Sequence, residues 1–99
     1  MYHVILISME ITEVEQRILK ALMTKDKMLA RELVEKSRAS TSVLNPSLKH
    51  LEELGLVKEE REEDFPRRRF IMLTDKGRKV GELLYEIEKT TSQSSLSNS

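Results

Sequence analysis

Two groups of polar side chains carry the chemistry that this sequence offers. One is a charged segment in which five carboxylates precede three arginines: Glu59, Glu60, Glu62, Glu63, Asp64, Arg67, Arg68 and Arg69. The other follows Arg38 and holds three hydroxyls, an amide and an amine: Ser40, Thr41, Ser42, Asn45 and Lys49. Arginine is attracted to negative potential, and hydroxyl groups at a helix N-terminus suit phosphate contacts. Both groups could therefore contact a polyanion.

The same residues do not form the active site of an enzyme. Nothing apolar surrounds the carboxylates of residues 59–64 in the sequence, so nothing would raise a pKa for acid–base catalysis. His3 and His50 are isolated, and there is no phosphate-binding glycine loop or nucleophile elbow. The absence of cysteine excludes disulfides and thiolate zinc sites. We expect no catalytic activity, no metal and no cofactor.

Charge is segregated along a chain whose formal net charge is zero. The 99 residues suffice for one domain, with 38% hydrophobic and 34% charged side chains. Residues 25–50 carry six basic and three acidic side chains, residues 52–64 two and seven, and residues 66–79 six and one. Because binding depends on the local field, the zero net charge does not exclude a polyanion partner.

The first residues, "MYHVILIS", hold an apolar run too short for a signal peptide or a membrane span. We therefore expect a cytoplasmic protein without a membrane segment. Residues 1–9 are expected to form an N-terminal extension, either an extra strand or a segment that faces a partner.

Helical periodicity defines the elements that position the hydroxyl cluster. Thr12 and Glu15 have the capping-box spacing, and the apolar stripe after them predicts a helix over about 12–24. The segment "MLARELVEKS" predicts a second, shorter helix. Leucines at spacings of four and three predict a third helix, which ends at Gly55.

Pro46 restricts where the third helix starts, because a proline is tolerated in the first turn but costs about 3 kcal/mol deeper in a helix. The helix therefore starts close to Ser42, or Asn45 is its N-cap. In either case the side chains of Ser42, Asn45 and Lys49 are exposed in its first turns.

The arginine-rich segment is predicted to lie on a hairpin. "LVKEE" and "RRFIMLT" have strand character, and Asp64-Phe65-Pro66 marks a turn between them. A fourth helix is predicted over 75–90, and the polar tail 91–99 is predicted to be disordered. The order of three helices, a two-stranded wing and a C-terminal helix predicts an α+β, mainly helical winged helix-turn-helix fold, with its DNA-binding domain at 10–74.

Two segments resemble the winged-helix regulators of the PadR and MarR type, including archaeal relatives. "LNPSLKHLEELGLV" is similar to the PadR pattern of a proline, two leucines, a Leu-Glu pair and Gly-Leu-Val. "PRRRFIMLTDKGRKV" resembles the return strand that runs into Leu-Thr-x-x-Gly. The chain departs from the PadR pattern at Asn45, where an aromatic residue usually precedes the proline.

The resemblance implies a sequence-specific, double-stranded DNA-binding transcriptional regulator, a dimeric repressor. The third helix would lie in the major groove, where Asn45 could read adenine and Lys49 a guanine or a phosphate. Ser40, Thr41, Ser42 and Arg38 would contact phosphates, and the wing arginines Arg67, Arg68 and Arg69 the backbone or the minor groove. Alternatively, the hydroxyl residues only cap the helix, and the arginines pair with the acids across the hairpin.

A homodimer interface is expected on the fourth helix, and its residues are Val80, Leu83, Leu84, Tyr85 and Ile87. These residues could instead pack within one chain. A homodimer would bind a palindromic operator, with two recognition helices about 34 Å apart. The resemblance also implies a small-molecule effector, which the sequence does not identify. The alternative function is a winged-helix protein–protein interaction module in a transcription complex, for which the acidic strand would be the contact surface.

Overall fold

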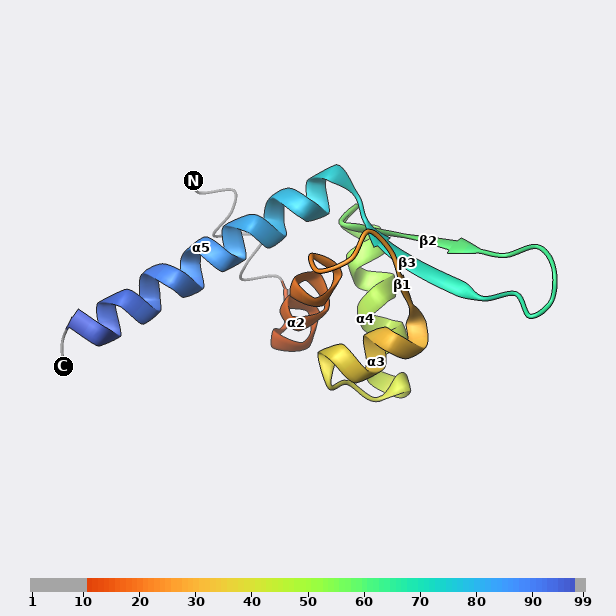
Figure 1. Cartoon of the computed structure of the whole chain (residues 1–99), viewed down its shortest axis with the longest axis horizontal. Helices are drawn as coiled ribbons and strands as arrows, with labels where there is room; N and C mark the ends of the chain where they lie inside the picture. Colours follow the sequence, from red (N-terminus) through yellow and green to blue (C-terminus); the bar gives the residue numbers. More distant parts are fainter. Residues whose placement is uncertain (1–10, 98–99) are drawn as a thin grey trace.

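The computed structural model describes residues 11–97 (Figure 1). The described residues form four helices and three strands: α2 (Glu13–Leu22), β1 (Met28–Leu29), α3 (Ala30–Ser37), α4 (Thr41–Glu53), β2 (Val57–Arg61), β3 (Arg69–Leu73) and α5 (Asp75–Ser97). The predicted N-terminal extension, residues 1–9, lies outside the described residues. The β2–β3 hairpin extends from one side of the helices, and α5 runs away on the other side (Figure 1). The winged helix-turn-helix fold is confirmed.

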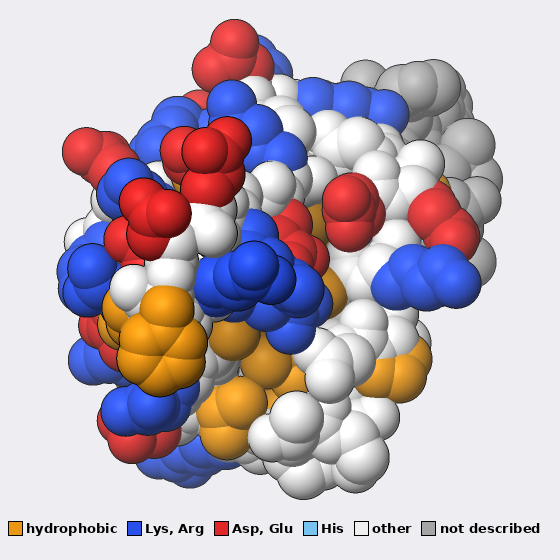
Figure 2. All heavy atoms as spheres, turned by 90° about the vertical axis from the view of Figure 1, so that its right-hand side faces the viewer, with side chains coloured by type: hydrophobic (Ala, Val, Ile, Leu, Met, Phe, Trp, Pro, Cys, Tyr) orange, Lys and Arg blue, Asp and Glu red, His pale blue; other side chains and the backbone are white. Residues whose placement is uncertain are grey.

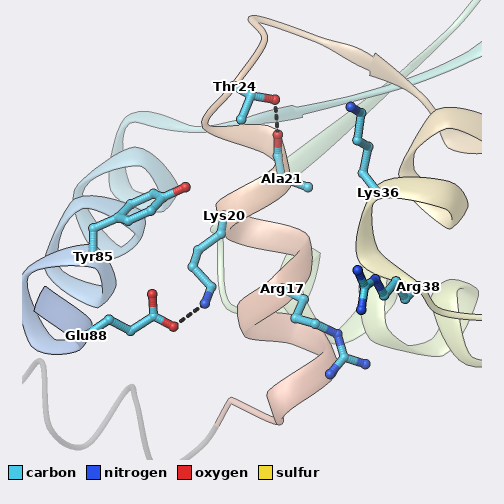
Figure 3. Close-up of a pocket in the computed structure, with 8 residues that line it drawn as sticks. All are labelled: Arg17, Lys20, Ala21, Thr24, Lys36, Arg38, Tyr85 and Glu88. Atoms are coloured by element: carbon cyan, nitrogen blue, oxygen red, sulfur yellow. Dashed lines mark hydrogen bonds and ion pairs between the residues drawn. The ribbon is translucent and has the colours of Figure 1, made fainter. Parts of the chain in front are cut away.

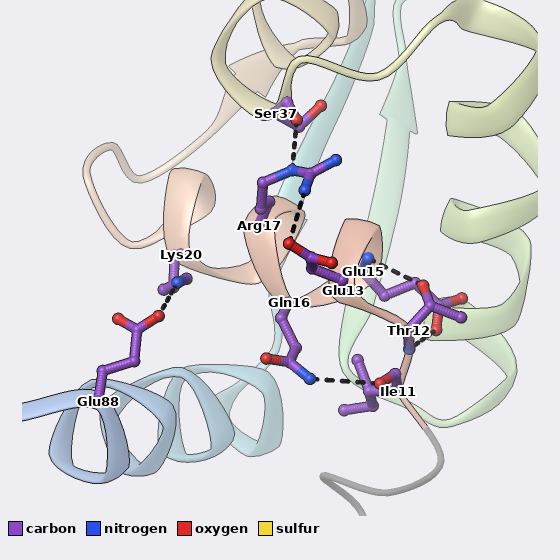
Figure 4. Close-up of polar contacts among 9 residues, drawn as sticks. All are labelled: Ile11, Thr12, Glu13, Glu15, Gln16, Arg17, Lys20, Ser37 and Glu88. Atoms are coloured by element: carbon purple, nitrogen blue, oxygen red, sulfur yellow. Dashed lines mark hydrogen bonds and ion pairs between the residues drawn. The ribbon is translucent and has the colours of Figure 1, made fainter. Parts of the chain in front are cut away.

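Helix α2 begins at the capping box that the sequence predicts (Figure 4). The Glu15 amide donates to Thr12 Oγ1 at 3.1 Å, and the Thr12 amide donates to Glu15 Oε1 at 3.0 Å. These bonds satisfy two backbone donors that a helix N-terminus otherwise leaves unpaired. The apolar stripe then buries Ile18, Leu19 and Leu22 almost completely. Helix α2 is therefore anchored in the core along one face.

The second helix begins later than predicted, because Met28 and Leu29 form a strand. The Leu29 amide donates to Glu32 Oε1 at 3.3 Å, and the helix starts only at Ala30. Met28 and Leu29 pair with Ile71 and Phe70 of β3. The predicted two-stranded wing is the β2–β3 hairpin, and β1 adds a third antiparallel strand to its sheet, in the order β1-β3-β2.

Helix α4 starts at Thr41, close to Ser42, which is the first of the two predicted positions. Ser40 is its N-cap, and its carbonyl accepts from the Leu44 amide at 2.8 Å. Pro46 therefore lies inside the helix, where it cannot donate to the carbonyl of Ser42. The predicted end is confirmed, because Gly55 adopts a left-handed φ of 75°.

The junction between β3 and α5 explains the Leu-Thr-x-x-Gly pattern. Leu73 is buried, and the Thr74 hydroxyl donates to the Gly55 carbonyl at 2.6 Å and accepts from the Gly77 amide at 3.0 Å. A Cβ on Gly77 would lie 1.8 Å from the carbonyl oxygen of Leu56. The pattern therefore packs the start of α5 against the end of α4.

Helix α5 is longer than predicted. It begins at Asp75 and continues to Ser97, so the tail predicted to be disordered at 91–99 is helical as far as the structure describes it. Its first turns close the core, where Val80 and Leu84 are 6% and 5% exposed.

Candidate nucleic-acid interface

The start of α4 presents an exposed polar surface beside the wing. Ser40, Thr41, Ser42, Asn45 and Lys49 are all exposed. The Ser40 and Ser42 hydroxyls are 3.0 Å apart, and neither makes a side-chain bond that caps the helix. Seen from the wing end, basic and acidic side chains are interspersed over the surface, with hydrophobic side chains exposed between them (Figure 2). Helix α4 thus leaves its N-terminal polar groups accessible to a ligand.

The wing arginines are of two kinds. Arg68 donates two hydrogen bonds to Glu62, from Nε at 2.8 Å and from Nη2 at 3.2 Å. Arg69 Nε donates to Glu59 Oε1 at 2.7 Å. Arg67 is exposed, and its side chain makes no hydrogen bond or ion pair with the residues that the structure describes. Pairing across the hairpin therefore engages two of the three arginines. Arg67 and Arg68 precede β3, so strand alternation does not set their directions.

These pairs shift the ionisation of the wing carboxylates. The hydrogen bond from Arg69 lowers the pKa of Glu59 below its ordinary value. The side-chain hydrogen bond from Arg68, together with that from its backbone amide, likewise lowers the pKa of Glu62. The same ion pair raises the pKa of Arg68. Both carboxylates are therefore charged at neutral pH and cancel part of the positive field of the wing.

The wing and α4 meet through a side-chain hydrogen bond. Arg69 Nη1 donates to Asn45 Oδ1 at 2.8 Å, and the two residues are 24 positions apart in the sequence. The bond joins a residue of each polar group that the sequence analysis distinguished. A cavity of about 280 Å³ lies beside it.

Arg31 and Val43 belong to the same surface. Arg31 lines the cavity beside Asn45 and a second one of about 520 Å³ that extends to Arg68. In the sequence Arg31 is a basic residue of the second predicted helix, which suits a phosphate contact, but its place beside Asn45 depends on how α3 packs against the wing. Val43 is 43% exposed and is not among the predicted site residues. It stands off the buried leucine stripe of its helix, which is a signal for exposure.

Arg38 lies at a different pocket from Asn45. This pocket, of about 480 Å³, lies over α2 between α3 and α5 (Figure 3). Its charged lining residues are four cations and one acid: Arg17, Lys20, Lys36, Arg38 and Glu88. Lys20 pairs with Glu88, and Arg17 Nε donates to the Ser37 carbonyl at 2.9 Å (Figure 4). Tyr85 forms an aromatic wall. The pocket carries an excess of positive charge.

A second polar contact ties α4 to α2. His50 Nδ1 lies 2.8 Å from Glu15 Oε2, and Glu15 is only 3% exposed. Because Glu15 also completes the capping box, one carboxylate contacts both the start of α2 and the last turn of α4. The orientation of α4 is thus set by a polar contact as well as by its leucines.

The predicted dimer residues divide between the core and the surface. Val80 and Leu84 are buried in the core of their own chain, which is the alternative that the sequence left open for them. Leu83 is half-buried, and Tyr85 and Ile87 are 45% and 43% exposed. Val80 and Leu84 lie one turn apart on the face toward α2, and Ile87 follows one turn further along the same face.

Within residues 11–97, no helix combines the length and the apolar character that a membrane span requires. The same part of the chain contains no group of three His, Asp or Glu side chains that could hold a metal ion.

A helix-turn-helix with an exposed second helix, followed by a β-hairpin wing, defines the DNA-binding domain of a transcriptional regulator. The chain belongs to the family described as the sugar-specific transcriptional regulator TrmB, whose model matches residues 6–76. The predicted resemblance to winged-helix regulators is thereby confirmed. No curated protein sequence matches the chain.

Similar solved structures are regulators of the MarR type. A MarR-family transcriptional regulator from Silicibacter pomeroyi is 27% identical with a TM-score of 0.75, and the match covers 86% of this chain and 57% of that one. The PcaV regulator from Streptomyces coelicolor is 24% identical with a TM-score of 0.81, over 91% of this chain and 66% of that one. MepR of Staphylococcus aureus is 24% identical with a TM-score of 0.78, over 95% and 70%. The chain thus spans less than two thirds of the length of the first two regulators.

Proposed function

We propose that the chain is a dimeric repressor that binds a palindromic operator through α4 and the wing and acts in the cytoplasm. The observation that carries the proposal is the exposed N-terminal half of α4, together with a wing arginine, Arg67, whose side chain has no partner among the described residues. Asn45 and Lys49 would face base edges, and Val43 would contact a thymine methyl group. Ser40, Thr41 and Ser42 would bind phosphate at the start of the helix.

The wing would contribute one arginine more strongly than the others. The Arg67 side chain has no ion pair within the described residues that DNA binding would break, whereas Arg68 would have to break or weaken its ion pair with Glu62. Arginine is drawn to the negative potential of a narrow minor groove. Arg67 is therefore our main candidate for the wing contact, and Arg31 would add a phosphate contact from α3.

Dimerisation would use the exposed side chains of α5. Tyr85 and Ile87 are 45% and 43% exposed, and Leu83 is half-buried. A two-fold dimer would present two copies of α4 about one DNA turn apart and select an inverted repeat. The MarR-type structures support the fold of each half, and sedimentation of the purified chain would measure the oligomeric state directly.

Titration with duplex DNA at several salt concentrations tests the proposal. Each phosphate that the protein neutralises contributes about −0.9 to the slope of log K against log salt. We expect a steep slope, and Arg67→Ala should flatten it by about one unit. Glu63→Ala on the same loop is the matched control and should not flatten it. Failure to bind any duplex at low salt would refute the proposal and favour the protein–protein module, whose surface would be the acidic strand β2.

We also propose that the pocket between α2, α3 and α5 binds a small anionic effector. Four cations against one acid, with Tyr85 as a wall, favour a ligand that carries phosphate or carboxylate. The family description names sugars, and PcaV has been solved with its natural ligand. Calorimetric titration with glucose 6-phosphate, glucose and inorganic phosphate separates the two components of such a ligand. If none of the three ligands binds, the proposal that this pocket is an effector site is refuted.

A further inference from the structure

The hydrogen bond between Arg69 and Asn45 bears on which base α4 reads. We propose that Asn45 and Arg69 act as one donor-only surface that selects guanine in the major groove, with Arg69 as the positioning residue. The inference rests on the proposed function, since it assumes that α4 enters the major groove.

The orientation of the Asn45 amide follows from the chemistry of its partner. A guanidinium has five N–H donors and no acceptor, so the atom that faces Arg69 must be the carbonyl oxygen of the amide. Arg69 Nη1 lies 2.8 Å from this oxygen. The NH₂ group of Asn45 therefore points away from Arg69, and its two donors are left for a ligand.

Arg69 is itself oriented by a second hydrogen bond, to Glu59. Its Nε donates to Glu59 Oε1 at 2.7 Å, and Glu59 also accepts from Arg61 at 3.3 Å. Arg69 is partly buried, with 27% of its side chain exposed. A guanidinium fixed by a carboxylate on the neighbouring strand imposes one orientation on the amide that it contacts. Glu59, Arg69 and Asn45 thus form a chain from the wing to α4.

The two purines present different edges to such a surface. Adenine shows the N7 acceptor and the N6 amino donor, whereas guanine shows two acceptors, N7 and O6. To read adenine, Asn45 must accept the amino group with the same oxygen that Arg69 occupies, beside a positive charge that repels a second donor. Guanine instead presents two acceptors, N7 and O6, to the donors of the Asn45 NH₂ group, whose orientation Arg69 fixes. The preference differs from the adenine contact that Asn45 alone predicts.

Selection of duplexes from a random pool, followed by substitution at the selected guanine, tests this inference. We expect the wild type to lose about tenfold in affinity, the lower range for one bidentate contact, when that guanine becomes adenine or 7-deazaguanine. In Arg69→Ala the loss should shrink to about threefold or less. Asn45→Asp keeps a partner for Arg69 but has no donors, and should also lose the guanine preference. Circular dichroism of each variant verifies that it is folded.

The salt dependence separates positioning from phosphate binding. If Arg69 only positions Asn45, Arg69→Ala changes the base preference and leaves the salt slope unchanged. A slope flattened by about 0.9 with the guanine preference intact would make Arg69 a phosphate contact and overturn the inference. Selected sites with adenine at the Asn45 position would overturn it as well, while the proposed function would stand. Failure to select any duplex would instead refute the proposed function, and this inference with it.

Discussion

The helical body and the wing are held together by different forces. The body, formed by α2, α3, α4 and the first turns of α5, buries aliphatic side chains almost completely, among them Ile18, Leu33 and Leu51. The wing, formed by β2, β3 and the loop between them, buries Val57, Ile71 and Leu73 where its strands meet the body, but its outer part carries paired charges on an exposed surface, as in Arg68–Glu62. Burial stabilises by roughly 25 cal/mol per Å² and depends little on salt, whereas exposed ion pairs contribute little and are screened. The body is therefore built for stability, and the wing for an electrostatic partner.

Removal of a core side chain should have the largest effect on stability. Leu51 is fully buried in the last turn of α4. Leu51→Ala loses buried methyl groups and leaves a cavity, which costs about 2–5 kcal/mol of the free energy of unfolding. Urea unfolding measures the loss. Glu52→Ala, on the exposed side of the same helix, is the control and should stay within about 0.5 kcal/mol. Equal losses for the two variants would contradict the division of the molecule into a buried body and a solvated surface.

The junction between the two regions should be the next most sensitive. In Gly77→Ala the new Cβ meets the backbone carbonyl of Leu56, at 1.8 Å from its oxygen, and the backbone must shift. We expect a loss of about 1–3 kcal/mol in thermal or urea unfolding. Gly81→Ala is the matched control, because its Cβ meets only the side chain of Met23, at 2.8 Å from the sulfur, which can rotate away. A larger loss for Gly81→Ala would show that α5 rather than the junction is tightly packed.

Substitutions in the wing should have the smallest effect on the free energy of unfolding, and this effect should depend on pH. The pKa values of Glu59 and Glu62 are lowered in the folded protein by Arg69 and Arg68. Groups of this kind stabilise the fold above the ordinary glutamate pKa of about 4.3, and the stabilisation is lost as the pH falls through the lowered values. We expect Glu62→Gln to reduce slightly the acid-induced fall in the free energy of unfolding, measured by denaturation at a series of pH values. In contrast, Glu63→Gln, which removes an acid without an ion pair in the described part of the chain, should leave this pH dependence unchanged.

The body was more predictable from the sequence than the wing contacts, for a physical reason. Helices α2 and α4 contain repeated apolar positions that face one core, so their periodicity identifies them, and the Thr12 cap and Gly55 mark two of their ends. Strand β1 has only two residues, too few for any period, and it exists because β3 lies beside it. The polar composition of residues 91–97 indicates disorder. These residues nevertheless extend a helix whose costly first turns are already packed, and each added residue gains one backbone hydrogen bond.

The candidate site shows a similar division. The residue types at the start of α4 and on the wing indicate a nucleic-acid partner, and the structure leaves those of α4 exposed. Which arginine is free could not be predicted, because Arg67, Arg68 and Arg69 are adjacent and equivalent in the sequence. Their partners Glu62 and Glu59 are chosen by the hairpin register, in which Arg61 faces Arg69. The bond from Arg69 to Asn45 depends on how two elements pack, and no local pattern carries that information.

The β3–α5 junction also has a mechanical consequence. Only Thr74 separates the strand from the helix, and its hydroxyl is bonded on both sides. The 23 residues of α5 extend about 34 Å from this point, at 1.5 Å per residue. Because Thr74 is held by two hydrogen bonds, a rotation of the far end of α5 is transmitted to the sheet. A rotation of about 5° around Thr74 would sweep the tip by roughly 3 Å, so in the proposed dimer a small change in the angle of α5 would alter the spacing of the two chains.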